Sequence, residues 1–99
     1  MRCGEGGVFV KRIIGLPGES VHEDSKGFID IDGKRLAEPY VSAPSRLADS
    51  AHFGGTWQVA KRGYFVLGDN RSESCDSRTW GSVPSRNIIG PVTRIMRTR

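Results

Sequence analysis

The chain has 99 residues, of which 36% are hydrophobic and 26% charged, and its formal net charge is +4. This length predicts one small domain, 1–99, and the composition excludes an intrinsically disordered chain. No apolar run approaches the roughly 18 residues of a membrane-spanning helix, and the polar segment 1–7 lacks the pattern of a signal peptide. We therefore expect the chain itself to be soluble.

The first half of the chain consists of short apolar runs separated by turn residues, which predicts a mainly β fold with little helix. Residues 8–14 are apolar and largely β-branched and predict a first strand. The Pro-Gly pair at 17–18 predicts a type II turn with its glycine at positive φ, and the strand resumes at 21–22. Residues 28–32 alternate apolar and acidic side chains and predict a half-exposed strand, which the Asp-Gly pair at 32–33 continues into a hairpin turn.

The second half begins with an irregular segment. Residues 38–56 hold prolines, glycines and small polar side chains and predict a long loop or insertion. Residues 56–59 and 64–67 predict two strands joined by a turn. Residues 82–87 predict a turn or a single helical turn, and residues 88–95 predict a last strand that a Gly-Pro pair interrupts.

A polar stretch, Gly68–Gly81, follows the predicted strand 64–67. It combines acids, arginines, serines and an asparagine with almost no apolar side chain. Asp, Asn and Ser side chains bond nearby backbone amides and hold tight turns. The stretch is therefore either a solvated connector or a polar scaffold that orients a reactive group elsewhere in the chain.

Lys11 lies within the first predicted strand. Alternation along a strand places Lys11 on one face with Phe9 and Ile13, and Arg12 on the other. A lysine that acts as a base must be neutral, which desolvation by apolar neighbours and an adjacent cation such as Arg12 both favour. From the residues alone, Lys11 fits a general base and an edge lysine that extends into solvent equally well.

Two segments together resemble the conserved boxes of type I signal peptidases. These segments, Lys11–Glu19 and Gly68–Gly81, stand in the order of that family, and the resemblance spans about 8–92. Glu19 stands where the family usually has Asp. Three further features agree with the family pattern: the hairpin at 32–33, Glu38–Val41 and Val83–Gly90. The resemblance implies small antiparallel sheets or a partly open barrel, and a serine endopeptidase with a Ser–Lys dyad, without metal or organic cofactor.

The resemblance also implies a role for each matching residue. Lys11 corresponds to the general base, and Ser74 to the hydroxyl that hydrogen-bonds the lysine amine and directs it toward the nucleophile. Four further residues correspond to two supporting ion pairs: Arg12 with Asp69, and Asp76 with Arg78.

The family's nucleophilic serine lies in a Ser-x-x-Pro-Thr box well before the lysine strand. Here ten residues precede Lys11 and none is serine, and no other serine stands in that context. Cys3 is a nucleophile before Lys11, but it lacks the flanking pattern. We therefore expect the C-terminal portion of a catalytic domain, with the base and its supports but without the nucleophile, and inactive alone.

The function that the resemblance implies is cleavage of signal peptides from exported proteins at the outer face of the bacterial cytoplasmic membrane. The expected partners of the complete enzyme are signal peptides and the membrane surface, not nucleic acid, and exposed strand edges predict some self-association. The alternative is a non-catalytic β module that binds peptides or a partner chain. A self-cleaving repressor-type protease is a third hypothesis, but no segment resembles a DNA-binding helix pair.

The cysteines and histidines give no metal-binding pattern. Cys3 and Cys75 match no zinc-ligand spacing, and His22 and His52 stand alone. The sequence leaves open whether the cysteines pair, and we expect two free thiols rather than a disulfide.

Overall fold

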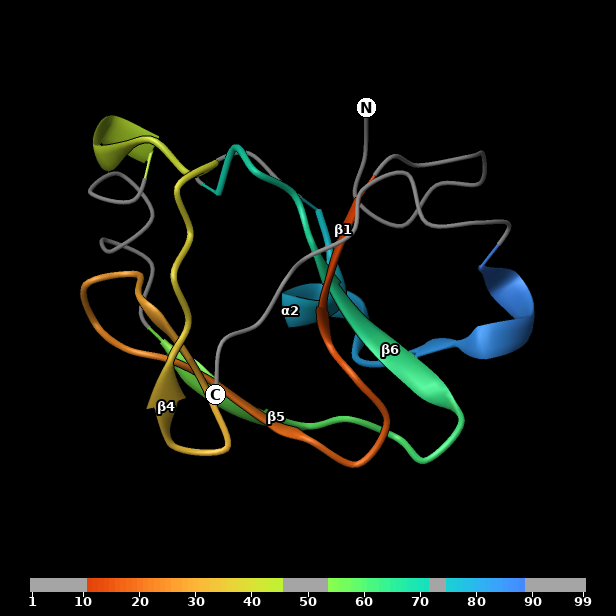
Figure 1. Cartoon of the computed structure of the whole chain (residues 1–99). Coiled ribbons are helices and arrows are strands. Elements are labelled where there is room, and N and C mark those ends of the chain that lie inside the picture. The colour runs from red at the N-terminus through yellow and green to blue at the C-terminus, as the bar shows by residue number, and fades with distance from the viewer. Residues whose placement is uncertain (1–10, 46–53, 72–74, 89–99) are drawn as a thin grey trace.

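The structure is a computed structural model that describes residues 11–45, 54–71 and 75–88. In these ranges the chain forms two antiparallel sheets, which confirms the predicted mainly β fold (Figure 1). The first sheet has the order β1-β6-β7, with β1 Arg12–Gly15, β6 Gly63–Leu67 and β7 Val83–Pro84. The second has the order β4-β3-β2-β5, with β4 Lys34–Arg35, β3 Ile29–Ile31, β2 Ser20–Glu23 and β5 Gly55–Gln58. Helical structure includes the short α2, Ser77–Trp80, and the 3-10 turn η2, Ser85–Asn87.

Both turns predicted from glycine-containing pairs are confirmed. Gly18 has φ +84°, and the Glu19 N–H donates to the Leu16 carbonyl at 3.0 Å. The buried Glu19 carboxylate also accepts the Leu16 N–H at 2.6 Å, so the glutamate that replaces the family's usual Asp closes this turn. In the β3–β4 hairpin, Asp32 and Gly33 have φ +49° and +84°, as a type I′ turn requires.

Within the described ranges the chain passes from one sheet to the other between β1 and β2 and again between β5 and β6. The two crossings lie side by side, because the Val59 N–H donates to the Glu19 carbonyl at 2.8 Å and the Gly18 N–H to the Val59 carbonyl at 3.1 Å. Gly15 ends β1 at this contact. A Cβ atom at Gly15 would lie 2.8 Å from a Val21 methyl and 2.9 Å from Phe65 Cβ, so this crossing requires glycine.

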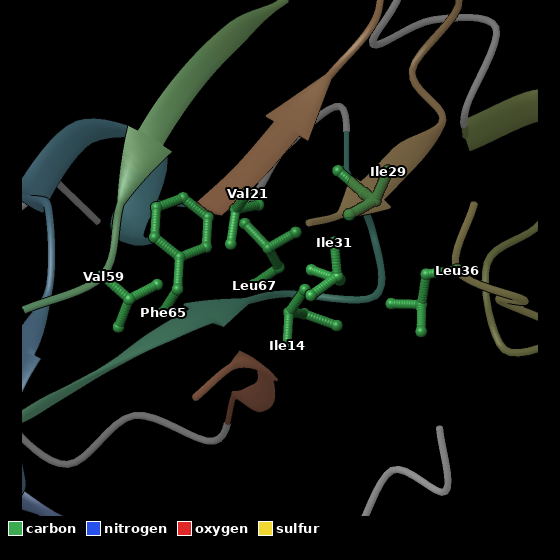
Figure 2. Close-up of a cluster of buried hydrophobic side chains, with 8 residues drawn as sticks. All are labelled: Ile14, Val21, Ile29, Ile31, Leu36, Val59, Phe65 and Leu67. Carbon is green, nitrogen blue, oxygen red and sulfur yellow. The ribbon is translucent and has the colours of Figure 1, made fainter. Parts of the chain in front are cut away.

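The hydrophobic core contains side chains from both sheets and from the segments beside them. Figure 2 shows these side chains converging from separate strands. Trp57 packs against this cluster from β5, with its ring centroid 5.2 Å from that of Phe65. The core residues are Ile14, Val21, Ile29, Ile31, Leu36, Val59, Phe65 and Leu67.

The strands differ from their predicted bounds by small amounts. The predicted strand 8–14 is described only from residue 11, and β1 extends to Gly15. The predicted segment 82–87 contains β7 followed by η2. Most of the predicted strand 88–95 and residues 46–53 of the predicted loop lie outside the described residues.

We expect Leu67→Ala to reduce the free energy of unfolding by about 2–5 kcal/mol, because the Leu67 side chain is 0% exposed and truncation leaves a cavity in the core. Leu16→Ala is the matched control. Leu16 is 42% exposed, so its truncation should change stability by no more than about 0.5 kcal/mol. Chemical denaturation of the two variants measures the difference, and equal losses would contradict this placement of the core.

Candidate active site

Lys11 directly precedes β1 and is half-buried. Strand β1 pairs with β6 in antiparallel register, with Arg12 opposite Leu67. The start of β1 therefore lies beside the end of β6, where the polar stretch begins. This register brings Lys11 and Arg12 next to Gly68–Arg71, although the two segments are far apart in the sequence.

Arg12 and Asp69 form a two-bonded ion pair across this junction. Arg12 Nε donates to Asp69 Oδ1 at 2.8 Å, and Nη2 donates to Oδ2 at 2.7 Å. The hydrogen bond from Arg12 holds the pKa of the Asp69 carboxyl below its usual value, and the same bond raises the pKa of Arg12. The sequence argument used Arg12 as a positive neighbour of Lys11. Asp69 compensates that charge, so Arg12 anchors the strand rather than acting as an isolated cation.

A second ion pair lies behind the first and is fully buried. Arg71 Nη1 and Nη2 donate to the two Glu38 carboxylate oxygens at 3.3 and 2.5 Å, and both side chains are at most 1% exposed. Arg71 Nε donates to the Gly68 carbonyl at 2.8 Å, which closes the turn that carries Asp69. Tyr40 connects the two pairs, because its hydroxyl donates to Glu38 and its ring lies over the Arg12 guanidinium.

Asp76 and Arg78 form a third ionic group. The buried Asp76 carboxylate accepts hydrogen bonds from Arg78 Nε at 2.9 Å and Nη2 at 3.0 Å. Arg78 Nη1 also donates to Glu23 Oε2 at 3.1 Å, and Nη2 donates to the Arg71 carbonyl at 2.9 Å. Because Glu23 belongs to β2, Arg78 ties the polar stretch to the four-stranded sheet.

Side chains of the polar stretch also bond backbone amides, as predicted. Asp76 is the N-cap of α2 and accepts the Arg78 N–H at 3.1 Å and the Gly68 N–H at 3.2 Å. The fully buried Ser77 hydroxyl accepts the Val66 N–H at 2.8 Å. The described part of this stretch is therefore a scaffold fixed to β6, and the interpretation as a solvated connector is wrong.

Two residues named in the sequence analysis, Ser74 and Cys3, lie outside the described residues. Cys75 is disulfide-bonded, so the expectation of two free thiols is wrong. The sequence has one other cysteine, Cys3. Separation along the chain does not limit disulfide formation, which depends on the distance between the two Cα atoms in the fold. The bond lies directly before Asp76, at the start of α2.

The described ranges offer neither a metal site nor a membrane span. Within them, no group of three or more His, Cys, Asp or Glu side chains is placed to hold a metal ion. Of the helices in the same ranges, none has the length and apolar character needed to cross a membrane.

Comparison with known proteins identifies the family. The sequence profile described as "Signal peptidase, peptidase S26" matches residues 3–96. The chain belongs to the signal peptidase family. This finding confirms the resemblance carried by the segments at Lys11 and at Gly68–Gly81.

Individual relatives agree with this assignment. The chain is 44% identical over 82 residues to signal peptidase I of Leptolyngbya laminosa, covering 83% of this chain and 37% of that protein. It is 36% identical over 96 residues to signal peptidase I V of Bacillus subtilis (strain 168), covering 87% of this chain and 56% of the relative. The chain thus spans between 37% and 56% of the length of these two relatives.

A solved structure supports the fold of this signal peptidase family member. The crystal structure of a signal peptidase I from Enterococcus faecalis V583 matches with a TM-score of 0.69 and 35% identity. The match covers 84% of this chain and 80% of the other.

The sequence analysis assigns no role to four residues of this candidate site: Glu23, Glu38, Tyr40 and Arg71. Glu38 and Tyr40 were placed in a predicted loop, yet Glu38 is buried and Tyr40 half-buried. The sequence does contain one indication of these partners. The polar stretch holds two arginines and packs on a strand, so each arginine requires a carboxylate partner. The sequence offers several acids for each arginine, so it could not identify which one.

We expect Arg12→Gln to raise the pKa of Asp69 toward the ordinary aspartate value of about 3.9. Because Arg12 lowers the pKa of Asp69 in the folded protein, the pair stabilises the fold above the ordinary carboxyl pKa and loses this contribution as pH falls through the folded pKa. The stability difference between parent and variant should therefore be largest near neutral pH and shrink in acid. It should be at most about 1 kcal/mol, since Asp69 is partly exposed.

Carboxyl NMR titration measures the Asp69 pKa, and Asp24 is the internal control. Burial acts to raise the pKa of Asp24, but hydrogen bonds from the Phe28 and Lys26 N–H groups outweigh it and keep the pKa below its usual value. Asp24 should titrate identically in both proteins. An unchanged Asp69 titration in the variant would show that Arg12 does not bind it in solution.

The disulfide predicts that the folded, oxidised chain reacts with a thiol-alkylating reagent at neither cysteine. After reduction and unfolding, mass spectrometry should detect two alkyl groups per chain. Cys75→Ala is the control, because it frees Cys3 and should be labelled once without reductant. Labelling of the untreated parent at Cys75 would contradict the bond.

Proposed function

We propose that this chain is the part of a signal peptidase I-type serine endopeptidase that carries the general base and its supports. The observation that carries the proposal is the two-bonded contact between Arg12 and Asp69. It joins the Lys-Arg segment to the Gly-Asp-Asn stretch, the two motifs that resemble the family's boxes. Their order in the sequence and their contact in the fold both agree with the family match to residues 3–96.

In this proposal Lys11 Nζ is the base. It takes the proton of a serine hydroxyl while the serine oxygen attacks the carbonyl carbon of the scissile peptide bond. The resulting ammonium then donates this proton to the nitrogen of the departing amine, and the C–N bond breaks. Water hydrolyses the acyl-enzyme with the same lysine as base.

The supporting residues have separate tasks in the proposal. Ser74 accepts or donates a hydrogen bond at the lysine amine and so directs its lone pair toward the nucleophile. Asp69 holds Arg12, and the Asp76–Arg78 pair holds the polar stretch on which Ser74 lies. These supports fix the direction in which the lysine amine points.

The attacking hydroxyl, in this proposal, is supplied from outside the 99 residues. No serine precedes Lys11, and none of the chain's serines stands in a Ser-x-x-Pro-Thr context. We further propose that the substrates are signal peptides of exported proteins, processed at the outer face of the cytoplasmic membrane. An extended peptide would pair with a strand edge, and small side chains would fill shallow pockets before the cleaved bond.

A hybrid protein tests the base. The 99 residues are joined to the N-terminal part of a family member that carries the Ser-x-x-Pro box, and cleavage of a preprotein is measured. Lys11→Ala should lower kcat/KM at least about 100-fold, because general-base catalysis is lost. Lys34→Ala, in the exposed strand β4, is the matched control and should leave kcat/KM within about twofold.

Two outcomes would overturn separate parts of the proposal. A hybrid that keeps its activity with Lys11→Ala would remove Lys11 as the base. Cleavage by the 99-residue chain alone, tested with the same preprotein, would show that the nucleophile lies within it.

A further inference from the structure

Tyr40 occupies a position between the two ion pairs beside Lys11. The Arg12 Cζ atom lies 3.7 Å from the centroid of the Tyr40 ring, so the guanidinium stacks on its face. The Tyr40 hydroxyl donates to Glu38 Oε2 at 3.2 Å. Tyr40 thus contacts Arg12 with its ring and a buried carboxylate with its hydroxyl.

Glu38 gives the tyrosine a rigid anchor. Its two carboxylate oxygens accept bonds from Arg71, and neither side chain of this pair is more than 1% exposed. A carboxylate held by two guanidinium donors in a dry site has one orientation. The hydroxyl of Tyr40 is therefore fixed at its far end, and its ring cannot swing away from Arg12 without breaking that bond.

Arg12 is constrained in two independent directions. In the plane of the guanidinium, Asp69 accepts two parallel hydrogen bonds. Perpendicular to that plane, the Tyr40 ring covers one face. In-plane bonds alone would still let an exposed carboxylate and its arginine move together, since Asp69 is 42% exposed. The ring removes this freedom.

We infer that Tyr40 is a positioning residue of the signal peptidase site: it clamps Arg12 onto Asp69 and, through the backbone of β1, fixes the direction of Lys11. This inference rests on the proposed role of Lys11 as the base. Tyr40 acts through Arg12, whose guanidinium its ring covers.

The tyrosine acts as a neutral hydrogen-bond donor. Burial, together with the nearby Glu38 carboxylate, raises the pKa of the Tyr40 hydroxyl above its usual value. The hydroxyl therefore keeps its proton at physiological pH, and its bond to Glu38 persists while a general base of the site changes its protonation state.

Two substitutions separate the ring from the hydroxyl. Tyr40→Leu removes the aromatic face, and Tyr40→Phe keeps it while losing the bond to Glu38. The chain's other tyrosine, Tyr64, is half-buried in β6, and Tyr64→Leu is the matched control. Each variant is made in the 99-residue chain and in the hybrid protein described above.

In the 99-residue chain, NMR gives two readouts that need no enzymatic activity. Tyr40→Leu should raise the Asp69 pKa by about half a unit or more, because a released Arg12 binds the carboxylate less well. The 13Cε relaxation of Lys11 should also show a less ordered side chain. Tyr40→Phe should change both readouts less than Tyr40→Leu does, because it keeps the ring and loses only the bond to Glu38, and Tyr64→Leu should leave both at the parent values. An unchanged Asp69 titration and unchanged Lys11 order in a folded Tyr40→Leu chain would overturn the inference.

In the hybrid, Tyr40→Leu should lower kcat about tenfold with KM changed less than twofold, since a misdirected base affects the chemical step. Tyr40→Phe should restore kcat to within about threefold of the parent. A fall in KM and kcat alike for both Tyr40 variants, matched by Tyr64→Leu, would indicate a structural role only and overturn the inference. An inactive parent hybrid would instead count against the proposed function, and the two NMR readouts would decide the role of Tyr40.

A measurement on the parent chain tests the inference even if the Tyr40→Leu variant does not fold. Nuclear Overhauser contacts between the Tyr40 ring protons and the Arg12 side chain, with upfield ring-current shifts of the Arg12 δ protons, should be present. Their absence in the folded parent would overturn the inference without any substitution.

Discussion

Arg71 is a buried cation whose bonds hold the polar stretch in one shape. Its guanidinium binds the Glu38 carboxylate and the Gly68 carbonyl, and its own carbonyl accepts a bond from Arg78. Burying a charge costs several kcal/mol unless a partner and further hydrogen bonds compensate it. Glu38 provides that compensation, and without it neither residue could be buried. The turn that presents Asp69 to Arg12 depends on this arrangement.

Ion pairs of this kind fix how the polar stretch is placed on a small apolar core. Hydrophobic burial is non-directional, so the core cluster of eight side chains among the described residues does not by itself fix the placement of a long polar stretch. A guanidinium–carboxylate pair has a fixed geometry, and where both partners are buried, as in Arg71 with Glu38, replacing either one leaves a buried charge. Except for Asp76 with Arg78, which are two residues apart, each pair here joins segments that are distant in the sequence. The pairs are Arg12 with Asp69, Arg71 with Glu38, and Arg78 with Glu23 and Asp76.

The features that could be predicted from the sequence are those set by local chemistry. The Pro-Gly and Asp-Gly turns follow from the φ values that glycine permits, and the bonds of Asp76 to backbone amides follow from the tendency of Asp side chains to bond nearby N–H groups; the short helix α2 was not predicted. The contact between Glu38 and Arg71 depends on how β6 and the segment after β4 come together, which no local pattern encodes. The same holds for the bond at Cys75. The family resemblance predicted the Arg12–Asp69 pair, because the roles of motif positions can be transferred between family members even where the contact itself cannot be derived from the sequence.

The register of β1 against β6 determines which of two neighbouring cations, Lys11 or Arg12, pairs with Asp69. Arg12 lies opposite Leu67, and residues opposite each other on antiparallel strands project from the same face. This register places Arg12 beside the turn that carries Asp69, where the two side chains meet. A slip of one residue would exchange them and place a lysine against Asp69. An ammonium group cannot reproduce the two parallel bonds of a guanidinium, so the Arg12–Asp69 pair favours the observed register over the one shifted by a residue.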